Sequence, residues 1–140
     1  MRVILDTNIL ASALISPHGL TDRLYGAWRE RRYTLVTSDH QLEEFRRITR
    51  YESVRRFIEP AAAGTLYNEL RELAVVLTKL PSVDVSADPA DNYLLAMARA
   101  GEVSYLATGD KRDLLKLKTF ERTKIVTVRR LLRVLGVEAD

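Results

Sequence analysis

Carboxylates follow or border apolar stretches in four separate parts of the chain. They are Asp6 after Val3-Ile4-Leu5, Glu43 and Glu44 within an amphipathic stretch, Asp88 and Asp91 beside Pro89, and Asp110 after Tyr105–Gly109. Gathered in one place, these groups would repel one another. A hard divalent cation such as Mg²⁺ or Mn²⁺ offsets that repulsion and prefers carboxylate and water oxygens. A site of this kind is suited to hydrolysis at phosphate.

The elements that would position these acids can be read from the apolar pattern. Short apolar runs predict strands over Arg2–Leu5, Tyr33–Val36 and Ser104–Thr108. Ile125–Val128 is either a final strand or the entry to the last helix. Apolar residues at helical spacing predict helices over Thr21–Arg32, after Ser38, from Pro60, after Asp88-Pro89, and over Arg129–Leu135. In the Pro60 helix the repeating residues are Leu66, Leu70, Leu73 and Leu77.

Several residues mark where these helices begin and end. Ser38 followed by Gln41 predicts a capping box, in which the two side chains satisfy each other's backbone N–H groups. Asp88 is typical of an N-cap, with Pro89 at the first helical position. Gly136 predicts the end of the last helix.

Strands alternate with helices, and the strands are apolar without clear polar alternation. This favours a three-layer α/β/α sandwich with a central parallel sheet, in one domain over residues 1–140. Parallel strands with right-handed crossovers place their carboxyl ends on one edge. Asp6 and Asp110 would meet there, and ligands of such sheets bind at that edge. Asp91, at a helix start, and either Glu43 or Glu44 would approach the same edge.

The chain resembles the PIN-domain nucleases, especially the toxin-like members of bacterial and archaeal toxin–antitoxin systems. The resemblance rests on the order and spacing of four motifs. They are Val3-Ile4-Leu5-Asp6-Thr7-Asn8-Ile9-Leu10, Ser38 with Leu42-Glu43-Glu44-Phe45, Asp88-Pro89-Ala90-Asp91-Asn92, and Tyr105-Leu106-Ala107-Thr108-Gly109-Asp110. Each motif alone has low specificity, but the four motifs in this order are fairly specific for the family.

The resemblance implies a Mg²⁺- or Mn²⁺-dependent ribonuclease that leaves 5′-phosphate and 3′-hydroxyl ends. It also implies a cognate antitoxin, a homodimer in many members, and single-stranded or looped RNA as substrate. By this resemblance the metal-binding and catalytic acids are Asp6, Glu44, Asp91 and Asp110, with Asp113 as a further acid and Asn8 and Thr108 as bordering polar residues. Members often carry one more acid where this chain has Lys111-Arg112, which weakens the case for Asp113.

Each residue also has a simpler structural interpretation. Asp6 and Asp110 are typical turn residues, Asp91 would complement a helix dipole, and Asp88 is foremost an N-cap. His18 and His40 are expected on loops or the surface. No histidine pairs with a serine or threonine in a recognisable triad, which disfavours nucleophilic hydrolysis.

Composition narrows the function classes. The 140 residues include 22 Lys+Arg, 19 Asp+Glu and no cysteine, which excludes disulfides and thiolate chemistry. No run is long enough to span a membrane, and no signal peptide begins the chain, so we expect a cytoplasmic protein. Residues 111–133 hold nine Lys/Arg and two acids. There Lys111, Arg112 and Lys116 are the candidates for RNA phosphate binding.

Two further classes of function remain open. One is a catalytically silent PIN-like scaffold that binds RNA or protein. It is disfavoured because a binder of polyanions gains nothing from clustered carboxylates. The other is a receiver-like domain, which would pair acids near the first strand, where this chain has Asp6 alone. A small-molecule phosphohydrolase is less favoured, since no Gly-rich phosphate loop is present.

Overall fold

A computed structural model describes residues 1–16, 19–109 and 112–137. The strands are β1 (Arg2–Leu5), β2 (Thr34–Ser38), β3 (Val75–Leu77), β4 (Tyr105–Ala107), β5 (Thr119–Phe120) and β6 (Thr123–Val126). The α-helices are α1 (Thr7–Ile15), α2 (Leu20–Arg29), α3 (Asp39–Ile48), α4 (Glu52–Arg55), α5 (Pro60–Leu73), α6 (Asn92–Gly101), α7 (Arg112–Leu115) and α8 (Val128–Leu135). A 3₁₀ turn, η1 (Pro89–Asp91), precedes α6.

In the part of the chain that is described, the strands form one sheet in the order β3-β2-β1-β4-β6-β5. All neighbouring pairs are parallel except β5 with β6. In the registers on either side of β1, Val3 pairs with both Leu35 and Tyr105. The carboxyl ends of β1, β2, β4 and β6 therefore share one edge of the sheet. This confirms the predicted α/β/α class, with β5 as an antiparallel addition.

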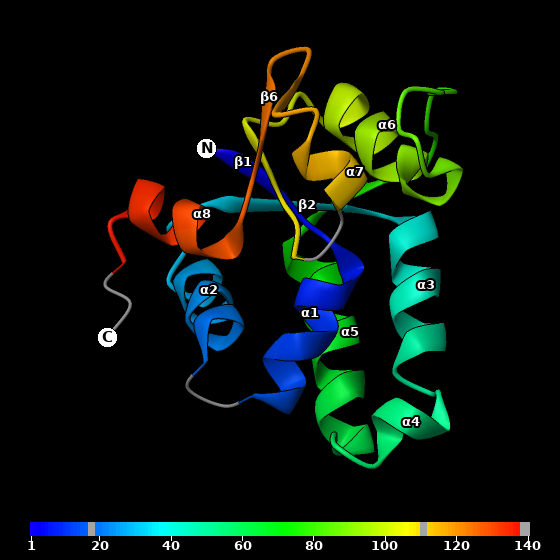
Figure 1. Ribbon diagram of the computed structural model, residues 1–140. Coiled ribbons are helices and arrows are strands. Elements are labelled where there is room, and N and C mark those ends of the chain that lie inside the picture. Colours follow the sequence, from blue (N-terminus) through cyan, green and yellow to red (C-terminus); the bar gives the residue numbers. More distant parts are fainter. Residues whose placement is uncertain (17–18, 110–111, 138–140) are drawn as a thin grey trace.

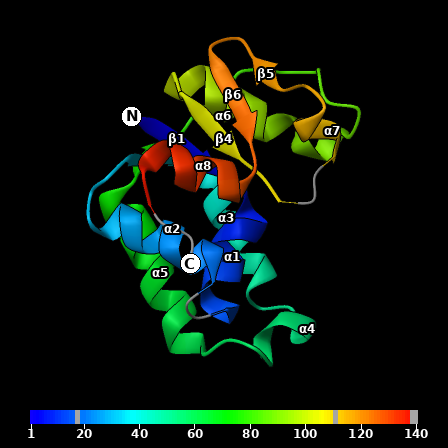
Figure 2. The same cartoon turned by 60° about the vertical axis from the view of Figure 1, so that its left-hand side comes forward.

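Helices cover both faces of the sheet (Figure 1). Consecutive residues of each central strand face opposite layers. In β1, Val3 and Leu5 join the core under α1, α2, α3, α5 and α8, whereas Ile4 joins the core under α6 and α7. In β4 the pair Ala107 and Leu106 divides in the same way. Figure 2 shows the same two layers from a second side. Burial on both faces explains why the strands read as apolar runs.

Most expected elements form with shifted ends. The Ser38 side chain accepts a hydrogen bond from the Gln41 backbone N–H at 3.0 Å, and Gly136 ends α8 with φ of 71°. The reciprocal half of the predicted capping box is wrong, because the Gln41 side chain bonds elsewhere, as described below. Leu66 and Leu70 are buried as expected, but Leu73 is exposed and Leu77 belongs to β3 rather than to the Pro60 helix.

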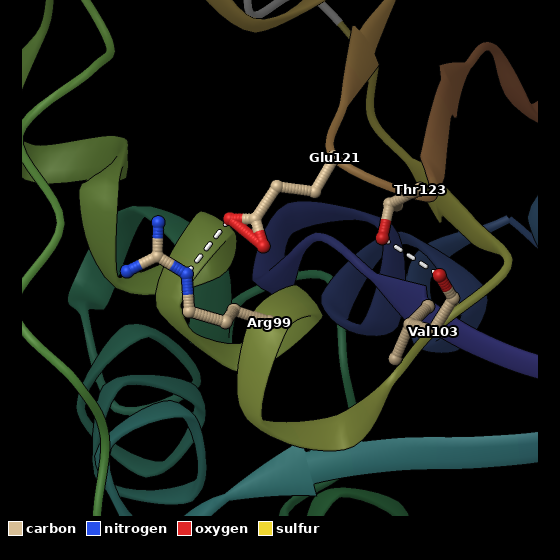
Figure 3. Close-up of polar contacts among 4 residues, drawn as sticks. All are labelled: Arg99, Val103, Glu121 and Thr123. Atoms are coloured by element: carbon tan, nitrogen blue, oxygen red, sulfur yellow. Dashed lines mark hydrogen bonds and ion pairs between the residues drawn. The ribbon is translucent and has the colours of Figure 1, made fainter.

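The β5–β6 turn is fastened to α6 at the far edge of the sheet. Arg99 Nε donates to Glu121 Oε2 at 2.7 Å, and the Thr123 hydroxyl donates to the Val103 carbonyl at 2.6 Å (Figure 3). The Arg99 guanidinium also lies over the Phe120 ring, with its central carbon 5.4 Å from the ring centre. These contacts lie at the amino end of β6, away from the carboxyl edge that carries the predicted site.

Candidate metal and nuclease site

Asp6 directly follows β1, as the sequence predicts, and it is also the N-cap of α1, a helix not expected from the sequence. Its backbone N–H donates to the Ala107 carbonyl at 2.9 Å, which fixes it beside the end of β4. Its carboxylate caps α1 by accepting from the Asn8 backbone N–H at 3.2 Å, and it accepts from the Thr108 hydroxyl at 2.8 Å. Only 1% of Asp6 is exposed, so these donors stabilise a charge that is largely removed from water.

The two polar residues expected to border the site act in different ways. Thr108 is buried and donates through its side chain to Asp6. Asn8 contributes its backbone N–H, while the residue itself is exposed on the first turn of α1. Both therefore contact the Asp6 carboxylate.

Gln41 ties α3 to the end of β1 through a buried amide. Its Nε2 donates to the Leu5 carbonyl at 2.7 Å and to the Thr7 hydroxyl oxygen at 3.4 Å. Its Oε1 accepts from the Thr37 hydroxyl at 2.7 Å. The amide therefore sets the position of α3, and with it the position of Glu44, relative to Asp6.

Glu44 is connected to the same place through Tyr93 of α6. The Tyr93 hydroxyl donates to Glu44 Oε1 at 2.9 Å, and it lies 2.9 Å from the Thr7 hydroxyl. Because the single phenol proton is directed at Glu44, Thr7 is the donor in the second bond. The hydrogen bonds then run in one direction, from the Gln41 amide through Thr7 and Tyr93 to the Glu44 carboxylate.

Tyr93 is held neutral by its surroundings. Burial raises the pKa of its phenol, and the negative charges of Glu44 and Asp6 raise that pKa further against the opposing hydrogen bond from Thr7. The phenol contacts Glu44 directly and Thr7, the residue after Asp6, on its other side, so it lies between the segments that carry the two acids. Tyr93 therefore stays a proton donor to Glu44 across the physiological pH range.

Asp91 lies at the end of η1, directly before α6, and only 2% of it is exposed. Two residues later in the chain, Tyr93 reaches Glu44, so the start of α6 borders the region shared by Asp6 and Glu44. Asp88 is the N-cap of η1, where its carboxylate accepts from the Ala90 backbone N–H at 3.0 Å. The expected capping role of Asp88 is confirmed, although α6 itself begins only after Asp91.

The remaining predicted residues follow β4. Asp110 and Lys111 lie outside the described residues, as does His18. Asp113 is half-buried and Arg112 exposed, both on the short α7, and Lys116 follows α7 on the surface.

A metal site of three or more protein ligands is not complete within residues 1–16, 19–109 and 112–137, where no such group of His, Cys, Asp and Glu lies close enough together. Asp110 lies outside those residues. The donor chemistry at the edge nevertheless suits a hard cation, because Asp6, Glu44 and Asp91 supply carboxylate oxygens.

Sequence reasoning missed two side chains that organise this edge, Gln41 and Tyr93. The sequence indicates Gln41 only as part of a capping box, and no motif points to Tyr93. A tyrosine two residues after an acidic helix start was the available signal for Tyr93. The exposed His40 ring packs over the Tyr93 ring, with 4.4 Å between ring centres, which agrees with its expected surface position.

These features define an α/β/α domain with acidic residues near the carboxyl edge of a mostly parallel sheet. A family model described as PIN domain matches residues 2–112. The chain therefore belongs to the PIN-domain family. PIN domains are generally nucleases that use divalent metals, which indicates nuclease-type hydrolysis for this chain. No curated protein and no solved structure matches it.

Among the described residues, no helix is both long and apolar enough to cross a membrane.

Proposed function

We propose that the chain is a metal-dependent endoribonuclease and the toxin component of a toxin–antitoxin pair. The observation that carries the nuclease proposal is the hydrogen-bonded arrangement of Asp6 and Glu44. Thr108 and the Asn8 backbone direct one carboxylate, Tyr93 directs the other, and the hydroxyl of Thr7, next to Asp6, contacts the same phenol. Such acids would oppose the binding of a polyanion on a surface that only bound it.

Asp6, Glu44, Asp91 and Asp110 are the residues we propose to hold Mg²⁺ or Mn²⁺, with Asp113 as an outer acid. A bound divalent ion supplies Lewis-acid stabilisation of phosphate and activation of water. The chain's own contribution is orientation. The Thr108 hydroxyl donates to one oxygen of Asp6, and the Tyr93 hydroxyl donates to one oxygen of Glu44. The second oxygen of Glu44 makes no bond to Tyr93.

Basic residues at the same edge would meet the RNA phosphates. Arg129, Arg130 and Arg133 of α8 line a hollow of about 350 Å³ with Leu115 and Val126, at the carboxyl end of β6. Arg112 and Lys116 lie on the neighbouring segment. We propose that these residues, together with Lys111, hold RNA on either side of the scissile bond.

Cleavage of a labelled single-stranded RNA by the purified chain tests this function. We expect cleavage with Mg²⁺ or Mn²⁺, none with EDTA, and products with 5′-phosphate and 3′-hydroxyl ends. Asp6→Asn should abolish cleavage, because the amide removes the charge and keeps the shape. Asp84→Asn is the matched control, because Asp84 is exposed in the loop before η1.

RNA binding without cleavage under either metal, unchanged by Asp6→Asn, would instead favour the silent scaffold. The toxin role has a separate test in a bacterial host. Expression of the chain should arrest growth, expression of Asp6→Asn should not, and co-expression of the adjacent gene should relieve the arrest if that gene encodes the cognate antitoxin. Growth without arrest would contradict the toxin role and leave the nuclease proposal standing.

The oligomeric state of the chain is a separate question, which is measured in solution. Light scattering on the purified chain separates a monomer from the homodimer that the family resemblance suggests.

A further inference from the structure

A second basic region lies on α3 and α4, away from the basic segment near the C-terminus. Residues 46–56 contain five arginines and one acid, Glu52. We call the surface formed by Arg46, Arg47, Arg50, Arg55 and Arg56, with the rings of Tyr51 and Phe57, the arginine surface. In Figures 1 and 2, α4 lies at the end of α3 that is farthest from the sheet.

The arginine surface contains two adjoining hollows. The larger, of about 640 Å³, lies between α3, α4 and α5 and has Phe45, Ile58 and Tyr67 among its walls. The smaller, of about 440 Å³, lies on the outer side of α3 and is lined by Arg47 and Tyr51. Arg46 and Arg50 line both hollows, so the two form one continuous depression with guanidinium groups along it.

These arginines differ from other arginines of the protein in their partners. Arg29, Arg71 and Arg99 lie within 4 Å of the carboxylates of Glu69, Asp39 and Glu121. In the described part of the chain, none of the five arginines of the arginine surface has such a carboxylate. Arg46 packs over the Tyr67 ring, and Arg56 over the Phe57 ring. Glu43 lines the smaller hollow and Glu52 lies in the same segment, so the five arginines outnumber the two acids. This excess of positive charge favours an anionic partner.

Exposed aromatic rings accompany these charges. Phe57 is 61% exposed and Tyr51 is 49% exposed, which makes them two of the most exposed large apolar residues described. Aromatic rings beside arginines are the combination by which proteins bind single strands, because bases stack on the rings while guanidinium groups bind the phosphates. An acidic peptide would use the charges and leave the rings unexplained.

The arginine surface also begins close to the candidate site. Arg47 follows Glu44 by three residues, which is about one turn of α3. Arg50 lies two residues beyond the end of α3 at Ile48. A strand lying at Glu44 can therefore continue over the outer side of α3 toward Arg50 and Tyr51.

We propose that the arginine surface is a second binding site for single-stranded RNA, which holds the substrate strand beyond the candidate site. Arg50 and Arg55 bind phosphates in the hollows, and Tyr51 and Phe57 stack bases. The choice of RNA as the ligand rests on the proposed function. The charge and the exposed rings are observed independently of that function.

Binding of a fluorescein-labelled single-stranded oligoribonucleotide, followed by anisotropy over a range of KCl concentrations, tests the proposal. All proteins carry Asp6→Asn and are measured in EDTA, so that cleavage does not interfere. We expect R50Q/R55Q to lower affinity about ten-fold. It should also reduce the slope of log affinity against log salt by about 1.4, from two lost phosphate contacts at about 0.7 each.

Two comparisons make the result specific. R122Q/K124Q removes the same charge from the β5–β6 hairpin, at the opposite edge of the sheet, and should leave affinity nearly unchanged. Phe57→Ala should lower affinity about five-fold or more without changing the salt slope, because stacking involves no counterion. Far-UV circular dichroism melts verify that each variant is folded.

Equal losses in R50Q/R55Q and R122Q/K124Q would overturn the proposal, because charge alone would then explain binding. Displacement of the RNA by a poly-glutamate peptide, together with unchanged affinity in Phe57→Ala, would overturn it in favour of an acidic protein partner. Failure of the proposed function would look different. The chain with intact Asp6 would then not cleave RNA, while the differences in RNA affinity between the variants would persist.

Discussion

The Tyr93 hydroxyl donates to Glu44 Oε1 at 2.9 Å, so a side chain from α6 sets the direction of a carboxylate on α3. The two residues are 49 positions apart in sequence and belong to helices on different layers of the sheet. Thr7 contacts the same phenol, next to Asp6. Tyr93 therefore couples two of the proposed metal-binding segments, and the His40 ring packs against it.

Tyr93→Phe should lower the cleavage rate about ten-fold at limiting Mg²⁺, because residues that orient a metal ligand typically contribute about 10- to 100-fold. The loss should shrink as Mg²⁺ is raised, since a misdirected Glu44 weakens metal binding more than it alters the reaction. Initial rates over a Mg²⁺ titration measure this. Tyr105→Phe is the control, because Tyr105 lies at the amino end of β4, away from the candidate site, and its hydroxyl has no hydrogen-bond partner among the described residues. An equal loss in both variants would refute a positioning role.

Thr108→Val should reduce cleavage to a similar extent, because it removes the hydroxyl that holds Asp6 Oδ2 and keeps the side-chain shape. Thr108→Ser restores the donor and should recover most of the rate. The same Mg²⁺ titration provides the measurement. If the cleavage rate of Thr108→Val depends on Mg²⁺ as the wild-type rate does, the Asn8 backbone and the end of β4 suffice to orient Asp6.

The sequence predicts those elements whose own residues show a recognisable pattern, such as an apolar run or a residue typical of a helix end. β1 was found because Val3, Ile4 and Leu5 are buried on both sides, and α8 was found because Gly136 can adopt the positive φ that ends it. α1 was missed. It follows β1 with only Asp6 between, and that aspartate serves as both its N-cap and a candidate ligand. The start of α6 was placed too early because Asp88 caps a 3₁₀ turn rather than the helix.

The candidate site was predictable in its acids and not in its hydrogen bonds. The order of the motifs indicates Asp6, Glu44 and Asp91 as candidate ligands, and the register of β1 with β4 puts Asp6 at the carboxyl edge of the sheet. No sequence pattern states that Gln41 would reach Leu5 or that Tyr93 would reach Glu44, because those bonds depend on how α3 and α6 pack. Average charge conceals the arginine surface, because the chain outside residues 111–133 carries more acids than bases.

Gln41→Leu should lower the free energy of unfolding by about 2–4 kcal/mol, because the Leu5 carbonyl and the Thr37 hydroxyl lose a buried partner. Urea unfolding at neutral pH measures the change. Thr37→Val in the Gln41→Leu background should recover part of the loss, since it removes one unsatisfied group. If the double variant loses as much free energy of unfolding as the two single variants together, Gln41 and Thr37 are not directly coupled.

Tyr33→Phe tests a pH dependence that comes from a buried phenol. Burial raises the pKa of Tyr33 above its ordinary value of 10.0, and its hydroxyl donates to the Leu24 carbonyl at 2.7 Å. Above pH 10 the unfolded chain releases this proton while the folded chain keeps it, so the unfolded state binds fewer protons and stability falls as pH rises. Below pH 10 the contribution of Tyr33 is fully present.

At about pH 8 the Tyr33→Phe variant should be about 1 kcal/mol less stable than the wild type, through loss of the hydrogen bond. Above about pH 10 this difference should narrow by up to about 1.4 kcal/mol per pH unit, because the variant side chain has no proton to lose in either state and only the wild type carries the penalty. Urea unfolding of both proteins at a series of pH values measures the difference, in which all other titrating groups cancel. A difference that stays constant from about pH 8 to about pH 11 would show that Tyr33 ionises alike in the folded and unfolded chains.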